Sequence, residues 1–140
     1  MKNLILILAI VLLGGSLFAQ GTIRIGLPIL PRVHTSDAEI VLTEADCGNV
    51  IHINGDADAI EFTLPGAKLG LVAAFWDISG AVVTVNPADG VDKIWVEAQD
   101  GGAGNSLESD GVIGRYIVLV AVDNTSWWAL PIETLTWGIP

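Results

Sequence analysis

The sequence predicts an all-β protein, on three observations. After residue 20 the apolar residues come in short runs that alternate with polar ones, the period of two expected of strands. Pairs such as Asp89-Gly90 and Asp110-Gly111 separate these runs and suit tight hairpin turns. No window of about 11 residues or more shows a helical period. We therefore expect a single antiparallel β-sandwich, or a jelly roll or small barrel, of about 8–10 strands.

The first 19 residues predict a secretory signal peptide. Lys2 precedes a ten-residue apolar run, residues 4–13, and small residues follow before a cleavage site after Ala19. The run is shorter than the roughly 20 residues that a membrane span needs. Leu17 is bulkier than the usual residue three positions before the cut, which leaves an uncleaved anchor as the alternative. We expect export to the extracellular space, the cell surface or the periplasm.

Residues 20–37 predict an extended N-terminal arm or linker. Three apolar residues alternate with Thr22, Arg24 and Gly26, and prolines 28 and 31 suit a sheet edge rather than a central strand. Such an arm could add a strand to a neighbour's sheet. The apolar residues of the arm are interface candidates: Ile23, Ile25 and Leu27.

Residues 38–140 form the predicted β-sandwich domain. Its expected strands are 38–43, 49–54, 59–64, 69–78, 81–86, 93–98, 115–122, 126–130 and 134–137. Residues 69–78 are almost continuously apolar, so we expect that strand to be buried on both faces. Residues 99–111 contain four glycines and are the one long loop that we expect.

The composition excludes several classes of protein. The chain has 140 residues, 51% of them hydrophobic, and a net charge of −10. Half the residues being apolar argues against disorder, and the negative charge argues against binding nucleic acid or anionic lipid. A single cysteine cannot form an internal disulfide or a cysteine-based zinc site. The apolar content is high for about 120 residues behind the signal peptide, which favours a partner, and another copy of the chain is the simplest one.

The acidic residues do not predict an enzyme. Most of them lie in turns, where they act as turn formers and solubilising groups. Four of them are weak candidates for a structural calcium ion, although their spacing matches no calcium-binding motif: Asp56, Asp58, Asp100 and Asp110. We expect no other cofactor.

Histidine and cysteine chemistry is also not expected to be catalytic. His52 lies inside a predicted strand, where a structural role is favoured, and His34 lies in the linker without a nucleophile motif nearby. Cys47 follows Asp46, which should raise its pKa, so we do not expect a reactive nucleophile. A buried side chain and an intermolecular disulfide are the two alternatives for it.

Tryptophans are the most suggestive local feature. Neighbouring residues of a strand point to opposite faces, so Trp127 and Trp128 can serve the core and a partner respectively. We favour core and subunit interface over sugar stacking for these residues. The candidates for an interface or ligand contact are Trp95, Trp127, Trp128 and Trp137.

The middle of the chain resembles β-domains of phage virions. Residues 41–75 run from Leu42-Thr43 through Asp46-Cys47-Gly48 and a hydrophobic strand to Thr63-Leu64-Pro65, and then from Gly70 along a strand that ends at Phe75. In residues 111–128 a hydrophobic strand precedes Asp123-Asn124-Thr125, and this stretch resembles the end of such domains. Tail fibres, tail spikes and capsid decoration proteins contain them. The resemblance implies a non-enzymatic structural domain that self-assembles, often as a trimer. We expect an exported subunit of a homo-oligomer or filament, with a carbohydrate-binding or adhesive module as the alternative.

Overall fold

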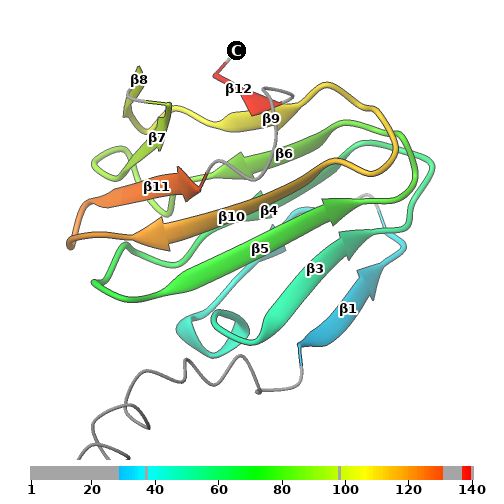
Figure 1. Cartoon of the computed structure of the whole chain (residues 1–140), viewed down its shortest axis with the longest axis horizontal. Helices are drawn as coiled ribbons and strands as arrows, with labels where there is room; N and C mark the ends of the chain where they lie inside the picture. Colours follow the sequence, from blue (N-terminus) through cyan, green and yellow to red (C-terminus); the bar gives the residue numbers. More distant parts are fainter. Residues whose placement is uncertain (1–28, 37, 98, 131–136, 140) are drawn as a thin grey trace, which may run out of the picture.

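The protein is a sandwich of two β-sheets packed face to face (Figure 1). The computed structural model describes residues 29–36, 38–97, 99–130 and 137–139. Within these ranges no helix is long and apolar enough to cross a membrane. The all-β sandwich predicted from the sequence is confirmed.

Two sheets account for the strands of the described residues. The seven-stranded sheet has, in spatial order, β1 (Leu30–His34), β3 (Val50–Asn54), β5 (Val72–Asp77), β10 (Tyr116–Ala121), β11 (Ser126–Leu130), β7 (Lys93–Val96) and β8 (Gln99–Ala103). The five-stranded sheet has β12 (Trp137–Gly138), β9 (Leu107–Ser109), β6 (Val83–Asn86), β4 (Ile60–Thr63) and β2 (Ile40–Val41). One turn of 3-10 helix, η2 (Glu44–Asp46), precedes β3.

The prediction of an antiparallel sandwich was wrong, because both sheets are mixed. From β1 to β6 the chain crosses from one sheet to the other after every strand, so neighbours within a sheet run parallel. Leu30 pairs with Val50, 20 positions further on, and Ile60 pairs with Val83, 23 positions further on. The turn signals between these strands are real, but each turn leads to the opposite sheet instead of back along the same one.

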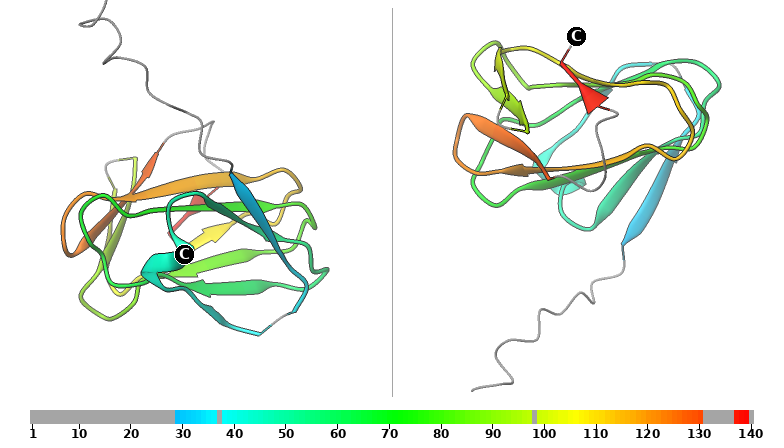
Figure 2. Two further views of the ribbon diagram at one scale, coloured as in Figure 1. Left: turned by 90° about the horizontal axis from the view of Figure 1, so that it is seen from below. Right: turned by 45° about the horizontal axis from the view of Figure 1, so that its top comes forward.

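The second half of the chain closes the sandwich mainly with antiparallel pairs, although β11 pairs with β7 in parallel. β10 lies between β5 and β11, and β9 lies between β6 and β12. Figure 2 shows the two layers from their edges.

The long loop predicted over residues 99–111 was also wrong, because β8 and β9 lie within it. Glycine allows β8 to approach its neighbours closely. A Cβ at Gly101 would lie 2.6 Å from the backbone oxygen of Ile94 and 2.8 Å from the side chain of Ile139. The glycines that predicted a loop therefore permit a tightly packed edge strand.

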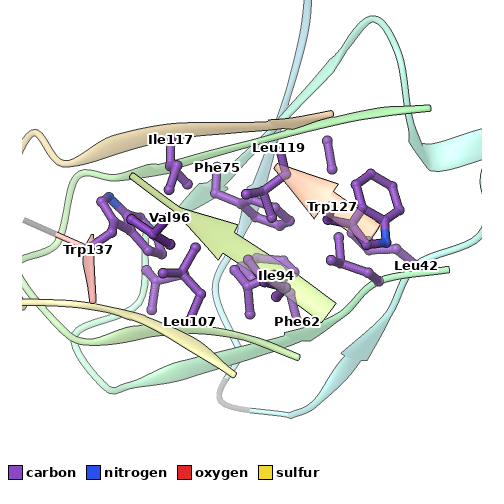
Figure 3. Close-up of a cluster of buried hydrophobic side chains, with 14 of the residues drawn as sticks. Leu42, Phe62, Phe75, Ile94, Val96, Leu107, Ile117, Leu119, Trp127 and Trp137 are labelled. Carbon is purple, nitrogen blue, oxygen red and sulfur yellow. The ribbon is translucent and has the colours of Figure 1, made fainter. Parts of the chain in front are cut away.

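Side chains from both sheets fill the interior (Figure 3). Phe75, Ile117 and Leu119 reach it from the seven-stranded sheet, and Phe62 and Leu107 reach it from the five-stranded sheet. The ring centroids of Phe62 and Phe75 lie 5.1 Å apart, which joins the two layers at their centre.

Some predicted boundaries differ from the strands observed. The predicted strand 69–78 is β5, from Val72 to Asp77, and it is not buried on both faces, since Trp76 is 41% exposed. The alternation of β5 places Phe75 in the core and Trp76 on the outside. β1 lies within the predicted arm, where it pairs with β3 of its own chain. The signal peptide and residues 134–136 lie outside the described residues.

Truncating Phe62 should test the contact between the sheets. Phe62 has no exposed surface, so Phe62→Ala should lower the free energy of unfolding by about 3–5 kcal/mol. Val41→Ala is the control, because Val41 is 66% exposed on the same sheet and should change stability by less than about 0.5 kcal/mol. Equilibrium unfolding in urea measures both, and equal losses for the two variants would contradict this account of the core.

Candidate functional site

The outer face of the seven-stranded sheet carries a continuous set of apolar side chains. Because Phe75, Leu119 and Trp127 point into the core, the residues that alternate with them point outward. The paired positions form three rows across the strands. We call these thirteen residues the outer apolar face: Val33, Ile53, Trp76 and Tyr116; Pro31, Ile51, Ala74, Val118 and Leu130; Val72, Val120, Trp128 and Trp95.

The exposed part of this face lies in its large side chains. Trp76 is 41% exposed, Trp128 is 44% exposed and Val33 is 54% exposed. Val118 on β10 lies between Trp76 on β5 and Trp128 on β11. Val118 belongs to the middle row, and each tryptophan belongs to one of the two outer rows, two residues away along the strands. This small central side chain is buried between its larger neighbours. Figure 1 is seen from the side of this sheet, with β5 and β10 in front of β4 and β6.

Trp95 and Trp128 stack on each other at one end of the outer apolar face. They are register partners on β7 and β11, with ring centroids 5.6 Å apart and an angle of 24° between the ring planes. Each indole therefore covers part of the other, and the pair presents one rigid aromatic surface.

Charges lie at the margin of this face and are paired. Lys93 Nζ lies 2.9 Å from Asp100 Oδ2 beside Trp95, and the hydrogen bond lowers the pKa of Asp100. Arg115 donates two hydrogen bonds to Asp110, of 2.8 and 2.7 Å, and they lower the pKa of that carboxyl. The thirteen residues of the face itself carry no charged side chain.

The weak calcium candidates do not come together. Asp100 and Asp110 are each paired with a cationic side chain, and Asp56 Oδ1 accepts the backbone N–H of Asp58 at 3.2 Å. Among the described residues no group of three or more histidine, cysteine, aspartate or glutamate side chains could hold a metal ion. Several aspartates serve as turn formers, as expected: Asp89 accepts two backbone N–H groups, and Asp123 accepts that of Thr125.

The tryptophan candidates divide between the core and the surface. Trp127 has no exposed surface and Trp137 is 6% exposed, so both belong to the core of their own chain. Trp95 and Trp128 lie on the outer apolar face. The arm candidates Ile23, Ile25 and Leu27 lie outside the described residues.

Two features of the site were missed by the sequence analysis. Trp76 was not among the candidates, because its continuous apolar run gave no alternation from which an outward direction could be assigned. His34 and His52 were considered separately, yet their ring nitrogens Nε2 and Nδ1 lie 3.2 Å apart. The parallel pairing of β1 with β3 brings them together, and no local pattern in the sequence signals that pairing.

Cys47 is half-buried after η2. Its Sγ lies 3.7 Å from the backbone oxygen of Thr43. Burial, with the nearby charges of Asp46 and Glu44, raises the pKa of the thiol from its ordinary 9.0 to about 11. The structure thus favours the first of the two alternatives for this residue, a packed side chain.

Comparison with known proteins adds no family to this description. No protein-family model matches the chain, and no curated protein matches it. Conclusions about function therefore rest on the sequence and on the geometry of the molecule.

The cysteine should react slowly in the folded protein. With a pKa of about 11, the thiolate fraction at pH 8 is about 100-fold smaller than with the ordinary value of 9.0. We expect Cys47 to react with a thiol-specific disulfide reagent about 100-fold more slowly in buffer than in urea, followed by absorbance. The chain has one cysteine, so the signal has one source. Equal rates in the two conditions would contradict the protected thiol.

Proposed function

We propose that this protein is a non-enzymatic structural module that self-associates through the outer apolar face. The observation that carries the proposal is the exposure of Trp76 and Trp128 within the continuous apolar set of side chains on this sheet face. A contiguous exposed apolar patch on a soluble domain is typical of an interaction site. Tryptophan in particular is enriched at the energetic centres of interfaces.

The area of this face supports an interface better than a solvent-exposed surface. A tryptophan side chain buries roughly 250 Å² at most, so Trp76 and Trp128 each leave about 100 Å² uncovered. Covering both contributes about 5 kcal/mol at ~25 cal/mol/Å², which is near the lower limit of the cost of association. Stable association therefore needs the surrounding apolar residues as well, Val33 and Leu130 above all, which are 54% and 45% exposed.

A second copy of the chain suits this surface. Trp76 and Trp128 lie on opposite sides of Val118, so a two-fold axis over Val118 brings Trp76 of one copy onto Trp128 of the other. The acidic residues that give the chain its charge of −10 lie mainly in turns, so two such faces can meet without bringing carboxylates together. The resemblance to self-assembling phage virion domains is consistent with this arrangement. Export by the signal peptide would place the assembly outside the cytoplasm.

Arm exchange is a further route to assembly within the same proposal. β1 is an edge strand whose partner is β3, so the same pairing can form between two copies if β1 of one adds to β3 of another. The preceding residues Ile23, Ile25 and Leu27 would extend that strand.

A carbohydrate-binding module is the second candidate function. The stacked pair of Trp95 and Trp128 favours it, because a sugar ring can lie on an exposed indole face. The stacking also argues against it, since each ring covers part of the face that a sugar would use. We therefore place self-association first.

Removing the exposed tryptophans should dissociate the assembly. Trp76→Ser and Trp128→Ser each remove an aromatic anchor, and we expect each to weaken association at least about tenfold. Sedimentation velocity over a series of concentrations measures this. Val41→Ser is the matched control, because Val41 is exposed on the five-stranded sheet and should leave association unchanged. Urea unfolding of each variant shows that the domain still folds.

Two outcomes would overturn self-association through this face. In one, the wild-type protein is a monomer at about 100 μM, a concentration at which even a micromolar interface is formed. In the other, both tryptophan variants sediment as the wild type does. Binding on a glycan array that Trp128→Ser abolishes would favour the carbohydrate-binding module instead.

A further inference from the structure

β1 is held to the sandwich by few interactions. It is the outermost strand of the seven-stranded sheet and pairs with β3 alone among the described residues. Four of its five residues are exposed. At the two ends of the ladder, Leu30 N–H donates to Asn49 O at 2.7 Å and Gly55 N–H donates to His34 O at 2.9 Å.

A histidine pair lies where β1 meets the core. His34 Nε2 lies 3.2 Å from His52 Nδ1, and His52 Nε2 lies 3.0 Å from the backbone oxygen of Asp46. A carbonyl oxygen only accepts, so His52 Nε2 carries the hydrogen. When His52 is neutral, its Nδ1 then accepts and His34 Nε2 donates to it. The hydrogen bond between the rings cannot form when both rings carry a proton.

The surroundings of the pair disfavour a charge. His52 has no exposed surface and lies between Phe62 and Phe75, each with its ring centroid 5.7 Å from that of His52. The His34 ring meets the edge of Phe62 with centroids 5.1 Å apart. Burial is the main reason that the pKa values of both histidines lie below their ordinary 6.5.

Neighbouring charges act in both directions on the pair: Arg32 opposes a proton and Asp46 favours one, and burial is the largest influence on the pKa of both histidines. β1 contributes Arg32, whose positive charge opposes protonation, and η2 contributes Asp46, which is already bound to Arg32 and Thr43. Those bonds hold the pKa of Asp46 far below its usual range, so Asp46 stays ionised while the histidines titrate. β5 ends in buried Asp77, whose Oδ1 accepts from Ser79 and Gly80, and β4 faces the pair with Phe62.

We propose that the His34–His52 hydrogen bond is an acid-sensitive latch that holds the edge strand β1 on β3. When both histidines carry a proton, every ring nitrogen is a donor, so His34 Nε2 and His52 Nδ1 oppose each other with hydrogens between them. The strand that separates without disrupting the sandwich is β1, because its other side has no neighbour among the described residues. Its departure exposes the hydrogen-bonding edge of β3, which can accept a strand from another chain.

The direction of the pH dependence follows from the lowered pKa values. Both histidines bind protons more weakly in the latched state than when β1 is released. The latch is therefore at full strength above pH 6.5 and weakens as the pH falls below that value. The ratio of molecules with β1 latched to molecules with β1 released should fall by about tenfold per pH unit for each histidine that takes up a proton when β1 is released.

Amide hydrogen exchange, read by NMR and corrected for the intrinsic pH dependence of exchange, tests the latch. The full chain is titrated from pH 7.5 downward until the ring carbon shifts show both histidines protonated. We expect the amides of Leu30 and Gly55 to lose protection at least about tenfold per pH unit below 6.5. The amide of Ala121, which donates to Leu71 O at 2.9 Å away from β1, should keep its protection.

The variant His34→Gln/His52→Gln supplies the control. The chain has two histidines, so this variant has none, and its exchange at Leu30 and Gly55 should no longer depend on pH over the same range. If the variant does not fold, the wild-type titration still decides. Retained protection at Leu30 and Gly55 with both rings protonated would overturn the latch, and so would an equal loss at Ala121, which means global unfolding. A pH dependence that persists in the folded variant would also overturn it.

Discussion

The contact that the rest of the structure depends on is that of Phe62 with the seven-stranded sheet. Its ring lies on β4 in the opposite sheet, yet it packs against His34 of β1, His52 of β3 and Phe75 of β5. Those three strands are neighbours in the seven-stranded sheet, and between each two of them the chain forms a strand of the five-stranded sheet. One buried side chain therefore fixes the relative positions of three parallel strands. A short hairpin turn cannot join parallel neighbours, so this contact does what a turn could not do.

The seven-stranded sheet is apolar on both faces, in its parallel strands β3 and β5 and also in its antiparallel strands β10 and β11. Parallel sheets in known architectures are covered on both sides, and their strands are correspondingly apolar. Here the inner face packs on the five-stranded sheet, whereas Trp76 and Trp128 lie on an outer face that no described part of the chain covers fully. The acidic residues are placed in the turns, where they accept backbone hydrogen bonds. Acidic side chains thus serve the turns, and the exposed apolar sheet face is the surface that the proposed self-association uses.

Local patterns in the sequence predicted the strands and turns well, and the long-range pairing poorly. Alternation of Ile60 and Phe62 with Glu61 and Thr63 specifies a strand with one buried face, and β4 is that strand. The alternation does not predict that the following turn leads into the opposite sheet. A turn residue determines a local backbone angle, and it does not determine which sheet the next strand joins. The glycines around Gly101 resemble loop formers, but a Cβ at Gly101 would lie 2.8 Å from Ile139, a residue distant in the sequence that no local pattern connects with it. The site was predicted only in part. Trp128 follows buried Trp127 in an alternating strand, which indicates an outward side chain, whereas Trp76 lies in an unbroken apolar run that indicates no direction.

The two proposed properties of this protein meet in β1. Alternate residues of that strand serve opposite faces: Val33 belongs to the outer apolar face, and His34 binds His52 at the inner one. A Cβ on Gly55 would lie 2.7 Å from Cγ1 of Val33, so the glycine at the end of β3 leaves room for this side chain. Release of β1 would remove Pro31 and Val33 from the outer apolar face in the same step that it opens the edge of β3. An assembly through the sheet face and an assembly through strand addition are then alternatives for this molecule, because each uses β1 in a different place. The protonation of the two histidines would shift the balance between these two assemblies.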